Sequence, residues 1–186
     1  MKKLFRLFCL MAIATLAMLP IEAQAANKGG DFTVGNKTFL LNGEPFVVKA
    51  AELHYPRIPR EYWEHRIKMC KSLGMNTICL YIFWNIHEQK EGQFDFTGNN
   101  DVAAFCRLAQ KHGMYVIVRP GPYVCAEWEM GGLPWWLLKK KDIRLRESDP
   151  YFIERVAIFE KEVGNPMISR ILEAAPELRE EMQKYG

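Results

Sequence analysis

Acidic, amide and aromatic side chains gather directly after three apolar runs of this sequence. The first run is followed by Glu52 and His54, the second ends in the segment 81–88, and the third leads into the segment 119–129. Carboxylates and amides exchange hydrogen bonds with hydroxyl groups, and the faces of Trp and Tyr rings cover the C–H side of a pyranose ring. This combination indicates a site for a sugar.

Glu127 is the carboxylate in these segments that we least expect to be merely solvated. It lies between a Gly-Pro-Tyr turn and the pair Gly131-Gly132. Cleavage of a glycosidic bond needs two carboxyl groups that flank the bond. Glu129 stands two positions further on, so in an extended segment the two carboxylates share one face and flank one another instead of a substrate. The spacing argues against Glu127 and Glu129 as a catalytic pair.

Other polar residues in these segments have structural interpretations that stay open beside the functional one. Glu52 and His54 are explained equally well by pairing with Arg57 or by capping a helix. Trp84 is expected in the core. His87 and Glu88 show no spacing typical of a metal site, so hydrogen bonding within the fold is expected of them.

The apolar runs alternate with segments of helical periodicity. Nearly continuous apolar runs are typical of parallel strands covered by helices. Strand and helix recur about every 35 to 40 residues, which predicts βα units and a parallel sheet. In such sheets functional groups collect where the strands end, and the polar segments stand at those ends. The expected strands and helices are, in chain order, 46–51, 60–73, 76–83, 101–112, 114–118 and 150–163.

Different patterns precede and follow these units. Two short β-like runs at 32–34 and 38–41 are separated by Gly35-Asn36 and predict an antiparallel hairpin. Asp149 is expected to cap the last helix, which should end at about Val163. Beyond it, 165–186 predicts a divergent helical tail of two short pieces divided by a proline.

The start of the chain has the pattern of a secretory signal peptide. Basic residues precede an apolar run that is too short for a membrane span, and Ala23-Gln24-Ala25 ends it with a cleavable small-x-small pattern. We therefore expect residues 1–25 to be removed, no stable membrane anchor after cleavage, and a secreted or periplasmic protein. Lys plus Arg total 25 and Asp plus Glu 22, and a balance of +3 gives no support for nucleic-acid binding.

The cysteines show no pattern typical of a metal or redox site. No C-x-x-C or Cys/His cluster with zinc spacing is present, so no metal is expected. Cys70, Cys79 and Cys106 are expected to be packed as small apolar residues. Cys125 stands beside the candidate site residues, so lining a site and plain packing both remain open for it.

Several long motifs resemble family-35 glycoside hydrolases, the β-galactosidases. The likeness covers about residues 31–164, and its most specific part is the run Arg-Pro-Gly-Pro-Tyr-Val-Cys-Ala-Glu-Trp-Glu-Met-Gly-Gly-Leu-Pro, which starts at Arg119. The other motifs that carry the resemblance are His54-Tyr55-Pro56-Arg57-Ile58-Pro59-Arg60-Glu61-Tyr62-Trp63, Leu73-Gly74-Met75-Asn76-Thr77, the segment 81–88 and Gly92-Gln93-Phe94-Asp95-Phe96.

The resemblance implies a (β/α)8 catalytic barrel and retaining hydrolysis of terminal β-galactosyl groups, with a β-galactoside as substrate and no metal or organic cofactor. It also implies that Tyr81, Cys125, Ala126 and Glu127 hold galactose. The family's acid/base glutamate lies in an Asn-Glu-Tyr-Gly motif after strand 4 and its nucleophile follows strand 7. Neither position is found in these 186 residues.

The expected fold is therefore α/β, a partial (β/α)8 TIM barrel of about the first three βα units, because a closed barrel needs eight units. A β-hairpin precedes it and a short helical tail follows. The expected organisation is a signal peptide at 1–25, the N-terminal portion of the barrel at 31–164 and the divergent tail at 165–186. Without its catalytic pair, the chain is expected to be inactive alone.

Two other functions remain open from the sequence. One is a small secreted galactose-binding or structural protein without catalysis, whose three βα units form an open sheet. The other is a thiol enzyme that uses Cys125 with His54 or His87, which requires a hydrogen bond between thiol and imidazole.

Overall fold

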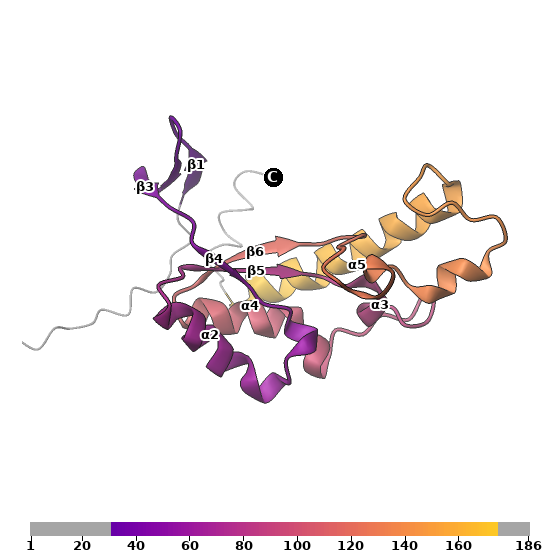
Figure 1. Ribbon diagram of the computed structural model, residues 1–186, viewed down its shortest axis with the longest axis horizontal. Coiled ribbons are helices and arrows are strands. Elements are labelled where there is room, and N and C mark those ends of the chain that lie inside the picture. Colours follow the sequence, from indigo (N-terminus) through magenta and orange to yellow (C-terminus); the bar gives the residue numbers. More distant parts are fainter. Residues whose placement is uncertain (1–30, 175–186) are drawn as a thin grey trace, which may run out of the picture.

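A three-stranded parallel sheet forms the centre of the protein (Figure 1). The computed structural model describes residues 31–174, so the expected signal peptide at 1–25 and the end of the expected tail, 175–186, lie outside the described residues. The sheet consists of β4 (Ala50–Glu52), β5 (Thr77–Tyr81) and β6 (Tyr115–Arg119), in the order β4-β5-β6. The predicted parallel sheet of three βα units is confirmed.

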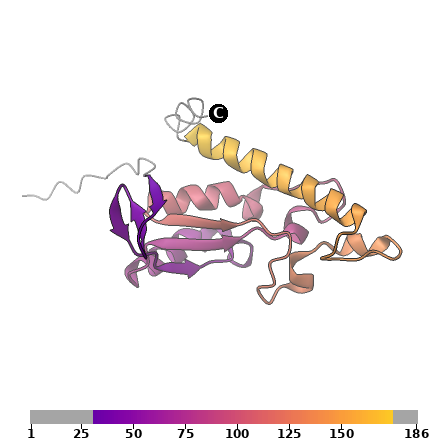
Figure 2. The same ribbon diagram turned by 90° about the horizontal axis from the view of Figure 1, so that it is seen from above.

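The long helices form a layer beside this sheet. They are α2 (Trp63–Ser72), α4 (Val102–Lys111) and α5 (Pro150–Ala174). The helix α4 contacts β6, α2 and α5, and in Figure 2 it lies between the strands and α5. The shorter helical elements are η1 (Tyr55–Arg57), η2 (Arg60–Tyr62), α3 (Trp84–His87), η3 (Gly98–Asn100), η4 (Glu129–Gly132) and η5 (Trp135–Lys139).

Alternate residues of the central strand face two different surroundings. Ile78, Leu80 and Ile82 are fully buried in the main core with the helices. Tyr81 and Phe83 belong to a second, smaller cluster. Because successive side chains of a strand point to opposite faces, these two residues lie on the face that the helices do not cover. Helices therefore cover one face of the strand, as expected of a parallel strand in a partial barrel, and Tyr81 and Phe83 form the smaller cluster on the other face.

Aspartates begin two of the long helices. The Asp101 carboxylate accepts a hydrogen bond from the backbone N–H of Ala104 (2.9 Å) at the start of α4. The Asp149 carboxylate accepts one from the backbone N–H of Phe152 (3.1 Å) at the start of α5, as the sequence predicts. Each contact satisfies a backbone donor that has no partner inside the helix.

The N-terminal segment forms three antiparallel strands where the sequence predicts a hairpin of two. They are β1 (Phe32–Val34), β2 (Phe39–Leu41) and β3 (Glu44–Phe46), paired in the order β1-β2-β3. The third strand contains Pro45, which lacks a backbone donor and is tolerated here because β3 is an edge strand. Figure 2 shows this meander at the end of the parallel sheet where the strands begin.

The last helix is longer than predicted. The sequence predicts an end at about Val163, followed by a separate tail from residue 165, but α5 continues through 164–166 to Ala174. Proline removes one helical hydrogen bond and bends a helix without requiring that it end. Within the part of α5 whose side chains are described, 150–164, Phe152, Phe159 and Val163 are buried in the core.

Candidate functional site

Polar side chains from all three parallel strands meet beside Tyr81, the last residue of β5. Tyr81 is the register partner of Arg119, the last residue of β6. The Arg119 guanidinium donates a hydrogen bond to the Tyr81 hydroxyl, and its central carbon lies 4.3 Å from the ring centroid. After β4, His54 lies edge-on to the Tyr81 ring at 5.6 Å between centroids, and its Nε2 is 2.7 Å from Oε1 of Glu52. Glu52 and His54 therefore pair with each other.

The surroundings of Tyr81 keep its phenol protonated. Burial raises the pKa of Tyr81 above its ordinary value, and the negative charge of Glu52 raises it further, while the positive charge of Arg119 lowers it. The net effect is a raised pKa. Since an ordinary tyrosine is already protonated at neutral pH, the Tyr81 hydroxyl keeps its hydrogen, and a hydrogen bond with the Glu52 side chain adds to the raised pKa.

The segment after β6 has a backbone that the sequence does not predict. Cys125, Ala126 and Glu127 have φ angles of 60°, 47° and 46°, so three successive residues other than glycine are left-handed. Such a conformation costs on the order of 1–3 kcal/mol for each residue. The segment is therefore not in the extended conformation that the spacing argument on Glu127 and Glu129 assumed. Both side chains are exposed, and Glu129 begins the separate helix η4.

Arg57, the last residue of η1, contacts this left-handed segment. Arg57 Nη2 donates to the backbone carbonyls of Ala126 (3.2 Å) and Glu127 (2.9 Å). Its guanidinium carbon also lies 4.5 Å from the ring centroid of Trp128. The Trp128 indole N–H in turn donates to Oδ1 of Asn85 (3.0 Å). The sequence offered Arg57 only as a partner of Glu52 and His54, whereas the structure pairs those two with each other and directs Arg57 to this segment.

The structure brings two of the predicted sugar-binding residues, Tyr81 and Ala126, into one cluster. Ala126 and Trp128 pack against the cluster formed by Tyr81, Phe83 and Val124. The neighbours of Ala126 in the chain, Cys125 and Glu127, are exposed. Their side chains are thus accessible next to a cluster that contains Tyr81.

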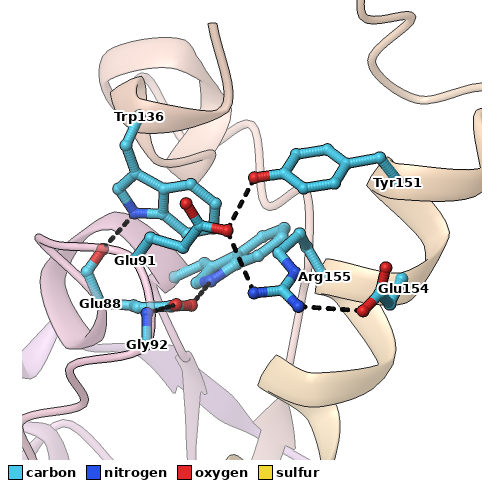
Figure 3. Close-up of polar contacts among 8 residues, drawn as sticks. Glu88, Glu91, Gly92, Trp136, Tyr151, Glu154 and Arg155 are labelled. Carbon is cyan, nitrogen blue, oxygen red and sulfur yellow. Dashed lines mark hydrogen bonds and ion pairs between the residues drawn. The ribbon is translucent and has the colours of Figure 1, made fainter. Parts of the chain in front are cut away.

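Trp84, His87 and Glu88 have structural roles, as predicted. All three are buried, and the Trp84 indole N–H donates to the Glu88 carboxylate (2.6 Å). The same carboxylate accepts from the backbone N–H of Gly92 (2.7 Å), and the Glu88 carbonyl accepts from the Trp136 indole (Figure 3). Burial raises the pKa of Glu88 and outweighs the hydrogen bonds that lower it.

An adjoining group of polar residues ties the loop after α3 to helix α5. Glu91 accepts hydrogen bonds from the Tyr151 hydroxyl (2.7 Å) and from the Arg155 guanidinium (3.1 Å), and both of these residues lie on α5 (Figure 3). Helix α5 is therefore attached to the loop that follows α3.

The thiols of the described residues are free. Cys106 is buried, Cys70 and Cys79 are half-buried and Cys125 is exposed, which agrees with packing roles for the first three. Both ring nitrogens of His87 are engaged, one by the Tyr55 hydroxyl and one by the Asp95 carbonyl. His87 is therefore not the base of a Cys125 thiol enzyme.

Neither a metal-binding cluster nor a membrane-spanning helix is found among the described residues. Within 31–174, histidine, cysteine and acidic side chains do not come together in a group of three or more that could hold a metal ion. In the same part of the chain, no helix has the length and apolar character needed to cross a bilayer.

Comparison of the sequence with known protein families shows to which family the chain belongs. The sequence model of the glycosyl hydrolases family 35 matches residues 38–175, well over half of the chain. The chain belongs to family 35 of the glycosyl hydrolases. The match extends beyond residue 164, where the sequence motifs stop, and includes the remainder of α5.

Curated members of family 35 share high identity with this chain. It is 45% identical to a β-galactosidase of Xanthomonas manihotis over 143 residues, which is 77% of this chain and 24% of that protein. It is 52% identical to the β-galactosidase of Mus musculus over 118 residues, covering 63% of this chain and 18% of that protein. The chain spans about a quarter or less of the length of these relatives.

A solved structure agrees with the fold of this family-35 segment. The exo-β-1,4-mannosidase Op5Man5 from Opitutaceae bacterium strain TAV5 matches with a TM-score of 0.52 and 22% identity, covering 64% of this chain and 22% of that one. At this identity the likeness concerns the fold alone. It supports the predicted partial barrel.

Replacing the charged neighbours of Tyr81 should shift its pKa in opposite directions. Because the positive charge of Arg119 lowers the pKa of Tyr81, Arg119→Gln should raise that pKa further. Because the negative charge of Glu52 raises it, Glu52→Gln should bring the pKa back toward its ordinary value. Titration of the tyrosine Cζ signals by ¹³C NMR measures both shifts, with Tyr81→Phe assigning the signal. Two shifts of the same sign would contradict the arrangement described here.

Proposed function

We propose that residues 31–174 carry the galactose-binding face of a β-galactosidase-type glycoside hydrolase. The observation that carries the proposal is the packing of Ala126 against the cluster that contains Tyr81, with Cys125 and Glu127 accessible beside it. The names of the curated relatives support the choice of a terminal β-galactosyl group as ligand. The strand-end position of these residues supports it too, since barrel enzymes place their sites there.

Each residue of this face has a chemistry that suits a hexose. The Tyr81 hydroxyl can donate to a sugar oxygen, and the exposed Glu127 carboxylate can accept from one or two sugar hydroxyls. Cys125 and Ala126 are small enough to let the ring approach the backbone. A hydrogen bond to a charged carboxylate is stronger than one between neutral groups, so Glu127 should contribute most to affinity.

Hydrolysis with retention requires two carboxyl groups about 5 Å apart on either side of the bond. Glu52 is paired with His54, and Glu88 is buried against Trp84, so neither is available for this chemistry. We therefore propose that the 186-residue chain binds β-galactosides without hydrolysing them. In family-35 enzymes the retaining reaction would then use two glutamates from parts of the barrel that these 186 residues do not include.

Binding of galactose tests this proposal. The chain should bind β-methyl galactoside in an NMR titration more tightly than the glucoside. Glu127→Gln should weaken that binding about tenfold or more, because a charge-assisted hydrogen bond is lost. The matched control is Glu147→Gln, whose exposed carboxylate pairs with Arg144 outside the site. Equal binding of galactoside by Glu127→Gln and the parent chain would contradict the proposal.

A chromogenic β-galactoside tests the second part of the proposal, that the chain does not hydrolyse its ligand. We expect no release of the chromophore above buffer. Release that disappears in Glu127→Gln would contradict binding without catalysis, and would return Glu127 and Glu129 to consideration as the catalytic pair.

We further propose that the protein is secreted or periplasmic. The proposal is supported by the basic start, short apolar run and small-x-small pattern within residues 1–25. Expression in a bacterium with N-terminal sequencing of the exported product tests it. The expected mature protein begins just after Ala25, whereas an intact Met1 in the cytoplasm would contradict it.

A further inference from the structure

The left-handed backbone at Cys125, Ala126 and Glu127 needs contacts that hold it. None of the three is glycine, the residue that adopts this conformation without steric cost. Within the segment, the backbone N–H of Trp128 donates to the Cys125 carbonyl (2.9 Å), and Val124 N–H donates to the Gly131 carbonyl (2.8 Å). These bonds close the turn but leave the carbonyls of Ala126 and Glu127 to other partners.

Arg57 supplies those partners from a distant part of the chain. One guanidinium nitrogen donates to both carbonyls, at 3.2 Å and 2.9 Å. A bond to each of two successive carbonyls fixes the direction of both peptide groups, and with it the direction in which the Glu127 side chain leaves the backbone. A charged donor makes each of these bonds stronger than a neutral one would.

Two aromatic rings in contact hold the Arg57 guanidinium in place. It lies over the Trp128 ring at 4.5 Å, and the Trp128 ring lies against Phe83 at 4.2 Å between centroids. Asn85 accepts from the Trp128 indole and fixes the ring in its plane. Arg57 therefore connects the left-handed segment with the residues that follow β5.

We propose that Arg57 is a positioning residue for sugar binding. It holds the backbone of Cys125–Glu127 in the left-handed conformation, in which Ala126 packs against the cluster that contains Tyr81 and Glu127 is exposed. The proposal rests on the galactose-binding function proposed above and adds a residue that does not itself touch the sugar. Lysine cannot replace it, because an ammonium group lacks the planar fork and stacks less well on an indole.

Hydrogen exchange tests the positioning role without any sugar. In Arg57→Lys, the backbone amides of 124–131 should exchange at least about tenfold faster, because the turn opens locally once its outside contacts are lost. The amides of α2 and α4 should keep their protection. Arg60→Lys is the matched control, since Arg60 likewise donates to a carbonyl, that of Gly98, and lies over an indole, that of Trp63.

Affinity for β-methyl galactoside completes the test. Arg57→Lys should weaken binding about tenfold, since part of the binding energy is then used to order the segment. Arg60→Lys should leave it unchanged. Arg57→Gln, which retains a neutral donor, should show a smaller increase in exchange than Arg57→Ala.

The outcomes separate the two proposals. If the parent chain does not bind galactoside but exchange at 124–131 accelerates in Arg57→Lys, the proposed function fails while the hold of Arg57 on the segment stands. The positioning role is overturned if exchange at 124–131 is unchanged, if every Arg57 variant loses protection equally throughout the chain, or if galactoside affinity is retained.

Discussion

Acidification from pH 7 to pH 4 should lower the free energy of unfolding by about 3 kcal/mol through His87 alone. The His87 ring is fully buried after β5. Burial lowers its pKa from 6.5 to about 4, although the Asp95 carbonyl and charge act in the opposite direction. Between these two values the unfolded chain binds a proton that the folded chain does not. The stability is therefore complete above about pH 6.5 and falls as the pH decreases toward 4.

The hydrogen bonds of His87 explain why the neutral form is required. Burial raises the pKa of Tyr55 well above its ordinary value, so its hydroxyl keeps its proton and can donate to Nε2 of His87. The Nδ1–H then donates to the Asp95 carbonyl (2.8 Å). A second proton on the ring would occupy the nitrogen that accepts from Tyr55. Protonation thus costs one hydrogen bond in addition to burying a charge.

Urea denaturation followed by circular dichroism at several values between pH 4 and pH 7 measures this effect. His87→Gln should be less stable at pH 7, but its stability should fall less steeply toward pH 4. The control is His65→Gln, an exposed position on α2, which should retain the slope of the parent chain. A slope that His87→Gln leaves unchanged would show that other groups account for the acid sensitivity.

The parts of the fold that the sequence predicts are those whose signals are local. The run 76–83 identifies β5 because apolar residues fill nearly every position, and Asp149 identifies the start of α5 because its carboxylate can reach the first free backbone donors. These features depend on neighbours within a few positions. The same holds for Tyr81, whose place at a strand end follows from the apolar run before it.

The parts that the sequence does not predict depend on distant contacts. Nothing in the residue types at 125–127 indicates a left-handed backbone, and its outside partner Arg57 stands about 70 positions earlier in the chain. The continuation of α5 through residue 166 is likewise a case in which a helix tolerates residues that usually end one. Motif likeness points to the residues that we propose bind the sugar, but it does not reveal how their backbone is held.

Phe159→Ala should destabilise the protein by about 3–5 kcal/mol, the second large effect that we expect. The Phe159 ring is fully buried on α5 and stacks on Trp84 at 5.1 Å between centroids with an interplanar angle of 18°. Removing the ring leaves a cavity beneath Trp84, the residue that begins α3 directly after the site residues of β5. The loss should therefore appear both in stability and in the attachment of α5.

Ile153→Ala on the same helix provides the comparison, because Ile153 is 52% exposed and should change stability by less than about 0.5 kcal/mol. Urea midpoints at pH 7 give both values. Hydrogen exchange then shows where the loss is felt: in Phe159→Ala the amides of 150–163 and of 84–92 should lose protection together, because Glu91 joins this loop to Tyr151 and Arg155. A loss of less than about 1 kcal/mol in the free energy of unfolding of Phe159→Ala would contradict the packing of α5 against Trp84. The residues 84–92 would then be ordered by the strands alone.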